Sequence, residues 1–236
     1  MTSTSELLAT AETALGYGDD ALVAAQRLIE WVARAPEIEE DVALANIALD
    51  LLGQARLLLT YAGSRMSPPR TEDDLAYERD ADAFRNVVLV ERENGDYAVT
   101  ITRLLLLSAA LVERYTALRE ASDPTLAAIA AKALPEVVYH RDHARLWALR
   151  LGDGTAESHR RMQAALVAEW PWFAALAEWP AARAWVEDVL VTATLEVPRT
   201  GAGNLQDGRL GEHTIALDDL LAELQQIARV HPGARW

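Results

Sequence analysis

The sequence predicts an all-α fold, and three observations lead to this expectation. Alanine and leucine dominate a chain of 236 residues in which 51% of the side chains are hydrophobic. The longer apolar runs have helical spacing, and no stretch alternates apolar and polar residues with the period of two that is typical of a half-buried strand. No break in composition marks a boundary, so we expect a single domain over residues 1–236.

The N-terminal part is expected to contain two helices separated by a turn. Residues 1–15 form a polar tail and a short helix, and the stretch Gly16 to Asp20 then has the composition of a turn. Asp19 and Asp20 favour the start of a second helix over residues 21–34, because negative charge stabilises a helix N-terminus. Pro36 ends that helix.

The longest uninterrupted helical pattern covers residues 38–63. It has no proline, and apolar side chains occur around most of its circumference, which predicts a helix inside a bundle. One narrow stripe is polar: Asn46, Asp50 and Gln54 follow one another at i, i+4 spacing, so we expect them to point the same way. Buried polar groups are costly unless they are satisfied, and the stripe therefore predicts a polar centre.

Turn and cap signals divide the rest of the chain. Pro68 and Pro69 mark a loop, and Asn94-Gly95 marks a turn between helices. Asp123 followed by Pro124 predicts a helix start, and Pro135 a kink within that helix. The expected helices cover residues 73–90, 97–121, 124–151, 155–179, 181–197 and 217–230, with a glycine-rich loop over 198–213.

Charge and composition exclude several classes of function. The net charge is −14 with a pI near 4.8, and Lys132 is the single lysine, so a nucleic-acid partner is not expected. No positive charge precedes the first apolar residues, and no apolar run approaches the roughly 20 residues of a membrane span. Cysteine is absent, which excludes thiolate metal sites and disulfides. The cytoplasm is the expected location.

Polar side chains also share one face of the expected helix 124–151, where Glu136, His140 and His143 follow at helical spacing. Polar groups in the middle of long helices predict a ferritin-like four-helix bundle with additional flanking helices. Dimetal sites in such bundles take one Glu from each of two helices and Glu-x-x-His from each of the other two. No Glu-x-x-His occurs in this chain, and Leu51 and Val137 stand where acids would be needed.

The sequence thus predicts a polar centre without a dimetal site, formed by Asn46, Asp50, Gln54, Glu136 and His140. Three alternatives remain open. Glu136, His140 and His143 could form a three-ligand zinc site in a metal-binding helical enzyme, against an ion pair and hydrogen-bonded histidines. Asp50 and Glu30 could pair for acid–base work. The chain could also be a stand-alone helical binding module.

Two further stretches have competing interpretations. The loop from Gly201 to Gly203 lacks the motif of a phosphate-binding loop and is more typical of a flexible connection. Seven Trp accompany only two Phe, and five of the Trp lie between Trp147 and Trp185. The cluster at Trp170, Trp172 and Trp179 fits either a core or an interface between subunits, since Trp is enriched at interfaces.

Four long stretches resemble one known family. These are EWVARAPEIEEDVALANIALDLLGQAR, LAYERDADAFRNVVLVERENGDYAVTITR, KALPEVVYHRDHARLWALRLGDGT and the ending LLAELQQIARVHPGARW. They are similar, in order and with similar gaps, to the C subunits of the bacterial ring-1,2-phenylacetyl-CoA epoxidase, also called phenylacetate-CoA oxygenase. The likeness extends over nearly the whole chain, from about residue 15 to its last residue.

The resemblance implies a ferritin-like fold and a structural, non-catalytic role beside an A subunit that carries the di-iron centre. It implies that the whole complex takes electrons from NADPH through a separate reductase and uses O2 to epoxidise phenylacetyl-CoA. It also implies that this chain has lost its metal site, so no cofactor of its own is expected. A heteromer with the A subunit is the expected assembly, with self-association as a further option.

Overall fold

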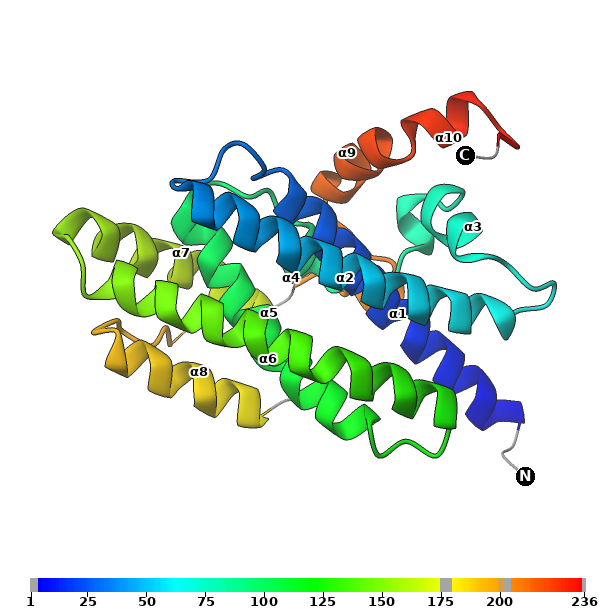
Figure 1. The fold of residues 1–236 in the computed structure, drawn as a ribbon, viewed down its shortest axis with the longest axis horizontal. Helices are drawn as coiled ribbons and strands as arrows, with labels where there is room; N and C mark the ends of the chain where they lie inside the picture. The colour runs from blue at the N-terminus through cyan, green and yellow to red at the C-terminus, as the bar shows by residue number, and fades with distance from the viewer. Residues whose placement is uncertain (1–3, 175–179, 200, 202–204, 235–236) are drawn as a thin grey trace. The chain divides into compact units, whose positions relative to one another are not determined.

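The computed structural model describes residues 4–174, 180–199, 201 and 205–234. All regular structure in these ranges is helical, which confirms the all-α prediction (Figure 1). The chain divides into two compact units, Met1–Glu93 with Gln206–Trp236, and Asn94–Leu205, which we call unit 1 and unit 2. The single domain expected from composition stays a prediction.

Unit 1 is built on two long helices that lie side by side, α1 (Thr4–Ile29) and α2 (Ile38–Ser64). The predicted turn from Gly16 to Asp20 is wrong, because α1 runs through this stretch without interruption. Its glycines permit close contacts: a Cβ on Gly18 would lie 2.8 Å from Leu59 Cδ2 of α2. Glycine thus marks a close approach between two helices here, and not the end of one.

The helix predicted over residues 38–63 is confirmed as α2, but its burial differs from the prediction. Its side toward α1 is apolar and buried, with Leu44, Ile47, Leu51, Leu58 and Leu59 at 2% exposure or less. The opposite side is also apolar but exposed. Among the described helices, α2 is the one long and apolar enough to span a membrane by composition, yet its packing against α1 is typical of a core helix.

The helix predicted over residues 73–90 does not form. Short elements replace it: α3 (Glu72–Tyr77), the 3-10 turn η1 (Ala81–Ala83) and α4 (Val88–Glu91), joined by extended backbone. Thr71 and Asp74 form a reciprocal capping box at the start of α3. Hydrogen bonds from buried side chains of unit 1 compensate for the helical hydrogen bonds that this segment lacks.

The C-terminal segment of unit 1 contains η2 (Gly208–Leu210), α9 (Ile215–Leu224) and α10 (Gln226–Val230). The single helix predicted over residues 217–230 is interrupted at Gln225. The Gln225 side chain is buried, and its Nε2 donates to the carbonyl oxygens of Ala76 and Arg79, each at 2.9 Å. This contact ties the C-terminal helices to the segment around α3.

Unit 2 consists of α5 (Tyr97–Leu118), α6 (Pro124–Gly152), α7 (Ala156–Ala174) and α8 (Pro180–Thr192). Helix α5 contacts each of the other three and is its centre. The predicted cap at Asp123 is confirmed, since its carboxylate accepts from the amides of Thr125 and Leu126. Residues 175–179, predicted to end one helix before Pro180, lie outside the described part of the chain.

The two helical glycines Gly18 and Gly53 give a matched test of this packing. Alanine has the higher helix propensity, so Gly53→Ala, where a Cβ meets nothing within 4 Å, should raise the free energy of unfolding by up to about 1 kcal/mol. Gly18→Ala should lower it by about 1–3 kcal/mol, because the new methyl group overpacks against Leu59. Urea unfolding measures both, and equal effects of the same sign would contradict the close approach of α1 and α2.

Candidate functional site

The polar stripe predicted on α2 does not point in one direction. Asn46 is exposed, Asp50 is half-buried and Gln54 is 2% exposed. An i, i+4 step advances about 40° beyond a full turn, so three such residues spread over roughly 80° of the helix surface. The stripe therefore passes from the solvent side of α2 to its packed side, and Asn46 does not belong to a buried centre.

The polar residues that were predicted to share one face of α6 also differ from one another in burial. His140 is 1% exposed, whereas Glu136 and His143 are half-buried and Lys132 is exposed. The Tyr139 ring lies 6.3 Å from the His140 ring and 6.2 Å from the His143 ring, centroid to centroid. Because α2 belongs to unit 1 and α6 to unit 2, the predicted network of Asp50, Gln54, Glu136 and His140 stays a prediction.

The residues do not fit a dimetal centre. Leu51 and Val137, at the positions where bridging acids would be needed, are 1% and 0% exposed. A buried aliphatic side chain supplies neither a ligand nor negative charge. In the residues that the structure describes, no three His, Asp or Glu side chains converge in a way that could hold a metal ion, and this includes Glu136, His140 and His143.

The geometry of unit 1 argues against the alternative pairing of Asp50 with Glu30, which stays a prediction. Glu30 follows directly after α1, and its carboxylate accepts from Arg27 Nη1 at 2.8 Å. Asp50 lies 12 residues into α2, which at the rise of an α-helix is roughly 18 Å from the start of that helix, where the connection from Glu30 ends. Of the predicted glycine loop, Gly201 is exposed and Gly203 lies outside the described residues.

Sequence reasoning missed the main polar cluster of unit 1, which begins at Asp19 on α1. Its carboxylate is fully buried and pairs with both terminal nitrogens of Arg79, with Oδ2 to Nη1 at 2.9 Å. Oδ2 also accepts from the Arg85 amide at 2.9 Å. Burial raises the pKa of Asp19, while the Arg79 guanidinium and the Arg85 amide oppose that rise.

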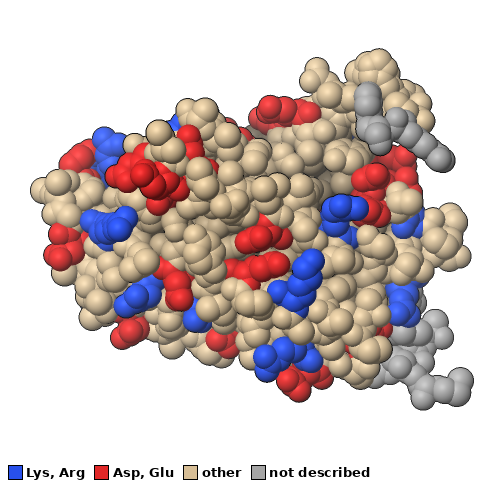
Figure 2. Space-filling model, in the orientation of Figure 1, with Lys and Arg blue, Asp and Glu red and all other residues tan. Residues whose placement is uncertain are grey.

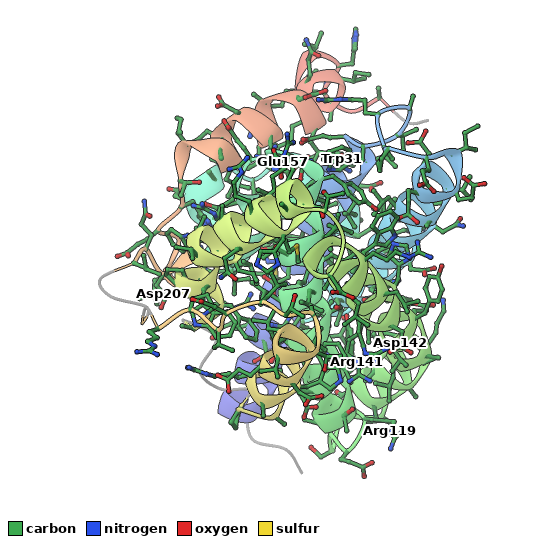
Figure 3. The ribbon with its side chains drawn as sticks, turned by 90° about the vertical axis from the view of Figure 1, so that its left-hand side faces the viewer. Trp31, Arg119, Arg141, Asp142, Glu157 and Asp207 are labelled. Atoms are coloured by element: carbon green, nitrogen blue, oxygen red, sulfur yellow. The ribbon has the colours of Figure 1, made fainter. Side chains whose placement is uncertain are left out.

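Asp20, the next residue of α1, binds a second arginine. Its carboxylate accepts from Arg209 Nη2 at 2.6 Å and from the Val87 amide at 2.7 Å. Arg209 Nη1 also donates to the Gly16 carbonyl at 2.8 Å, and a Cβ on Gly16 would lie 2.7 Å from that nitrogen. Asp207 begins the same turn and accepts from the Arg209 amide (Figure 3). Two successive carboxylates thus hold two distant segments on one helix.

The third carboxylate of this polar cluster is the buried Glu91, at the end of α4. It accepts from Asn86 Nδ2 at 2.8 Å, from the Thr214 amide at 2.6 Å and lies 2.7 Å from His213 Nδ1. His213 Nε2 lies 3.1 Å from the Phe84 carbonyl oxygen. Because both ring nitrogens face acceptors, the imidazolium that donates from both is the form that fits.

The pKa of His213 follows from this geometry. Burial by itself lowers it and the Arg85 charge lowers it further, but the Glu91 carboxylate and the Phe84 carbonyl outweigh both, so the pKa is raised above 6.5. Arg27 completes the cluster from α1, donating to the carbonyl oxygens of Glu91 and Ala216. We call Asp19, Asp20, Glu91, Arg27, Arg79, Arg209 and His213 the unit 1 polar cluster.

Unit 2 has its own buried polar contact and an aromatic core. Arg103 of α5 lies 3.4 Å from Glu169 of α7, and both side chains are at 7% exposure or less. Trp170 is fully buried and meets the Phe173 ring edge-on at 5.6 Å. The Trp147 ring meets Tyr97 at 5.1 Å, and Arg141 stacks over the half-buried Trp185 ring at 4.7 Å.

These positions divide the tryptophan cluster. Trp170 and Trp147 belong to the core of unit 2, while Trp172 and Trp185 are half-buried and Trp179 lies outside the described residues. A role of the half-buried members at an interface between subunits stays a prediction.

The chain is similar to known proteins over most of its length. A family model described as "Phenylacetic acid catabolic protein" matches residues 2–186. The C subunit of the 1,2-phenylacetyl-CoA epoxidase of Escherichia coli (strain K12) is 43% identical over 242 residues, which cover 94% of this chain and 97% of that protein. The similarity extends over both units.

Removing Asp19 should be far more costly than removing an equally well-paired surface carboxylate. Asp19→Ala leaves Arg79 buried without a counter-charge, which should lower the free energy of unfolding by about 3–5 kcal/mol. Glu157 of α7 pairs with Arg160 and Arg161 but is solvent-exposed, so Glu157→Ala is the matched control and should change stability little. Denaturant unfolding of both variants checks this, and similar losses would contradict the assigned burial.

The His213 contact predicts a pH dependence of stability. Its folded-state pKa is raised, so the stabilisation is fully present below 6.5 and is lost as pH rises through the folded pKa. The free energies of unfolding of the wild type and of His213→Gln, measured in urea, should therefore converge as the pH rises above 6.5, because the wild type loses its advantage. The exposed His231 is the control, and His231→Gln should follow the wild type at every pH.

Proposed function

Because the chain belongs to the phenylacetic acid catabolic protein family, we propose that it is a non-catalytic, structural subunit of a multicomponent phenylacetyl-CoA epoxidase. In this proposal the di-iron centre lies in a partner A subunit, and a separate reductase supplies electrons from NADPH. The complex acts in the aerobic degradation of phenylacetate, in the cytoplasm.

One observation supports the non-catalytic assignment: apolar side chains occupy the positions where metal-binding acids would be needed. A dimetal site in a ferritin-like bundle needs bridging carboxylates that neutralise and hold two cations. Leu51 and Val137 are buried aliphatic side chains at those positions. The chain therefore lacks the carboxylates that such a site needs, and this favours a protein that acts by binding to another subunit.

The unit 1 polar cluster supports a scaffold role. Each of its three carboxylates has counter-charges or several donors within the unit, and each joins segments far apart in the sequence. An interaction surface that is held rigid before binding loses less conformational entropy in the complex.

The purified chain should contain no stoichiometric iron. The expected result of elemental analysis, after expression in iron-supplemented medium, is a content far below one iron atom per chain, because the bridging acids are missing. A content of about two iron atoms per chain, the stoichiometry of a dimetal site, would contradict the proposal. One zinc per chain would instead favour the alternative with Glu136, His140 and His143.

Association with the A subunit is the direct test of the proposal. Co-expression with a tagged A subunit should give a stable heteromer that persists through size-exclusion chromatography, and epoxidation of phenylacetyl-CoA should require both chains. Full activity of the A subunit and reductase without this chain would contradict a structural role.

A further inference from the structure

Helix α2 carries a second apolar side that unit 1 does not use for its own packing. Ile38 is 79% exposed, Val42 55% and Leu49 60%. These residues lie within about 40° on the helix surface, and Asn46 and Gly53 extend the same side. We call Ile38, Val42, Asn46, Leu49 and Gly53 the α2 strip. A surface helix of a globular protein normally presents polar side chains on this side.

Gly53 shows that the strip is open. A Cβ built there meets no heavy atom within 4 Å, so the packing of α2 does not require a glycine. Glycine in the interior of a helix costs up to about 1 kcal/mol relative to alanine. A missing side chain at the end of an exposed apolar strip allows the backbone of another helix to approach closely there.

Charged residues border the strip on both flanks. The exposed Glu39 lies on one flank. Arg56, whose side chain is 71% exposed and whose Nη2 lies 3.5 Å from Glu72 Oε1, lies on the other, about 100° away around the helix. They are also separated by 17 residues, or roughly 26 Å along the axis. Figure 2 shows the face on which α2 is drawn: acidic side chains gather at the N-terminal end of α2, and a largely uncharged stretch follows.

This charge pattern disfavours a second copy of the chain. An antiparallel pair of α2 helices related by a two-fold axis would place each flank against the same flank of its partner, so Glu39 would not meet Arg56. A parallel pair would bring the acidic first turns of the two helices together, where like charges repel. The acidic N-terminal end of α2 also disfavours an anionic lipid surface.

We propose that the α2 strip docks the chain onto the catalytic A subunit, through a helix face that is apolar at its centre and basic opposite the acidic N-terminal end of α2. The inference rests on the proposed function and adds to it the surface and the chemistry of the partner. An apolar centre with a charged rim is the usual anatomy of a specific protein interface.

Binding of purified A subunit to variants of the full-length chain tests the proposal. Leu49→Glu should raise the dissociation constant at least about tenfold, because it places a charge in the apolar centre. Gly53→Leu should raise it similarly while leaving the melting temperature of the chain alone unchanged or higher. The control is Val191→Glu on α8, a residue 69% exposed and outside the strip, which should bind like the wild type.

The outcomes separate this inference from the proposed function. Wild-type chain that does not bind the A subunit would overturn both. Wild-type binding that Leu49→Glu and Gly53→Leu leave unchanged would overturn the strip alone. Light scattering that shows a dimer of the isolated chain, abolished by Leu49→Glu, would assign the strip to a second copy and overturn the inference. Co-flotation with phosphatidylglycerol vesicles that Leu49→Glu abolishes would assign the strip to an anionic lipid surface and would also overturn the inference.

Discussion

The ion pair between Asp19 and Arg79 is the contact on which the organisation of unit 1 depends. It buries a carboxylate and a guanidinium together, and the same carboxylate accepts from the Arg85 amide. The carboxylate of the neighbouring Asp20 accepts from the Val87 amide and pairs with Arg209. Since removal of either partner leaves an unpaired buried charge, the irregular segment and the C-terminal segment can adopt these positions only together with α1.

Charge neutralisation inside the protein links this arrangement to the proposed function. Ferritin-like catalytic bundles use metal cations to neutralise buried carboxylates. In unit 1 Asp19, Asp20 and Glu91 are instead paired with Arg79, Arg209 and His213. The supposed metal positions at Leu51 and Val137 are apolar. These pairings need no bound ion, which fits the proposed role of a protein that contributes shape and surface to a complex.

The two sides of α2 connect the interior of unit 1 with its surface. One side packs on α1 through buried leucines and isoleucine, and the other exposes Ile38, Val42 and Leu49. The apolar residues around its circumference, which predicted a helix buried on every side, therefore serve both an internal and an external contact. For the proposed structural role, an exposed apolar side is a feature through which the chain can contact another protein.

The sequence by itself determined the all-α class, the long helices α2, α5 and α6, the cap at Asp123 and the missing ligand pattern, because these follow from periodicity and local spacing. Tertiary structure decided the course of α1 through Gly16 and Asp20, the short elements of residues 72–91 and the exposed side of α2. Glycine and aspartate indicate a turn only where no distant group packs against the glycine or pairs with the carboxylate. Here Asp19 and Asp20 bind arginines 60 and 189 residues away, and such partners cannot be inferred from local pattern.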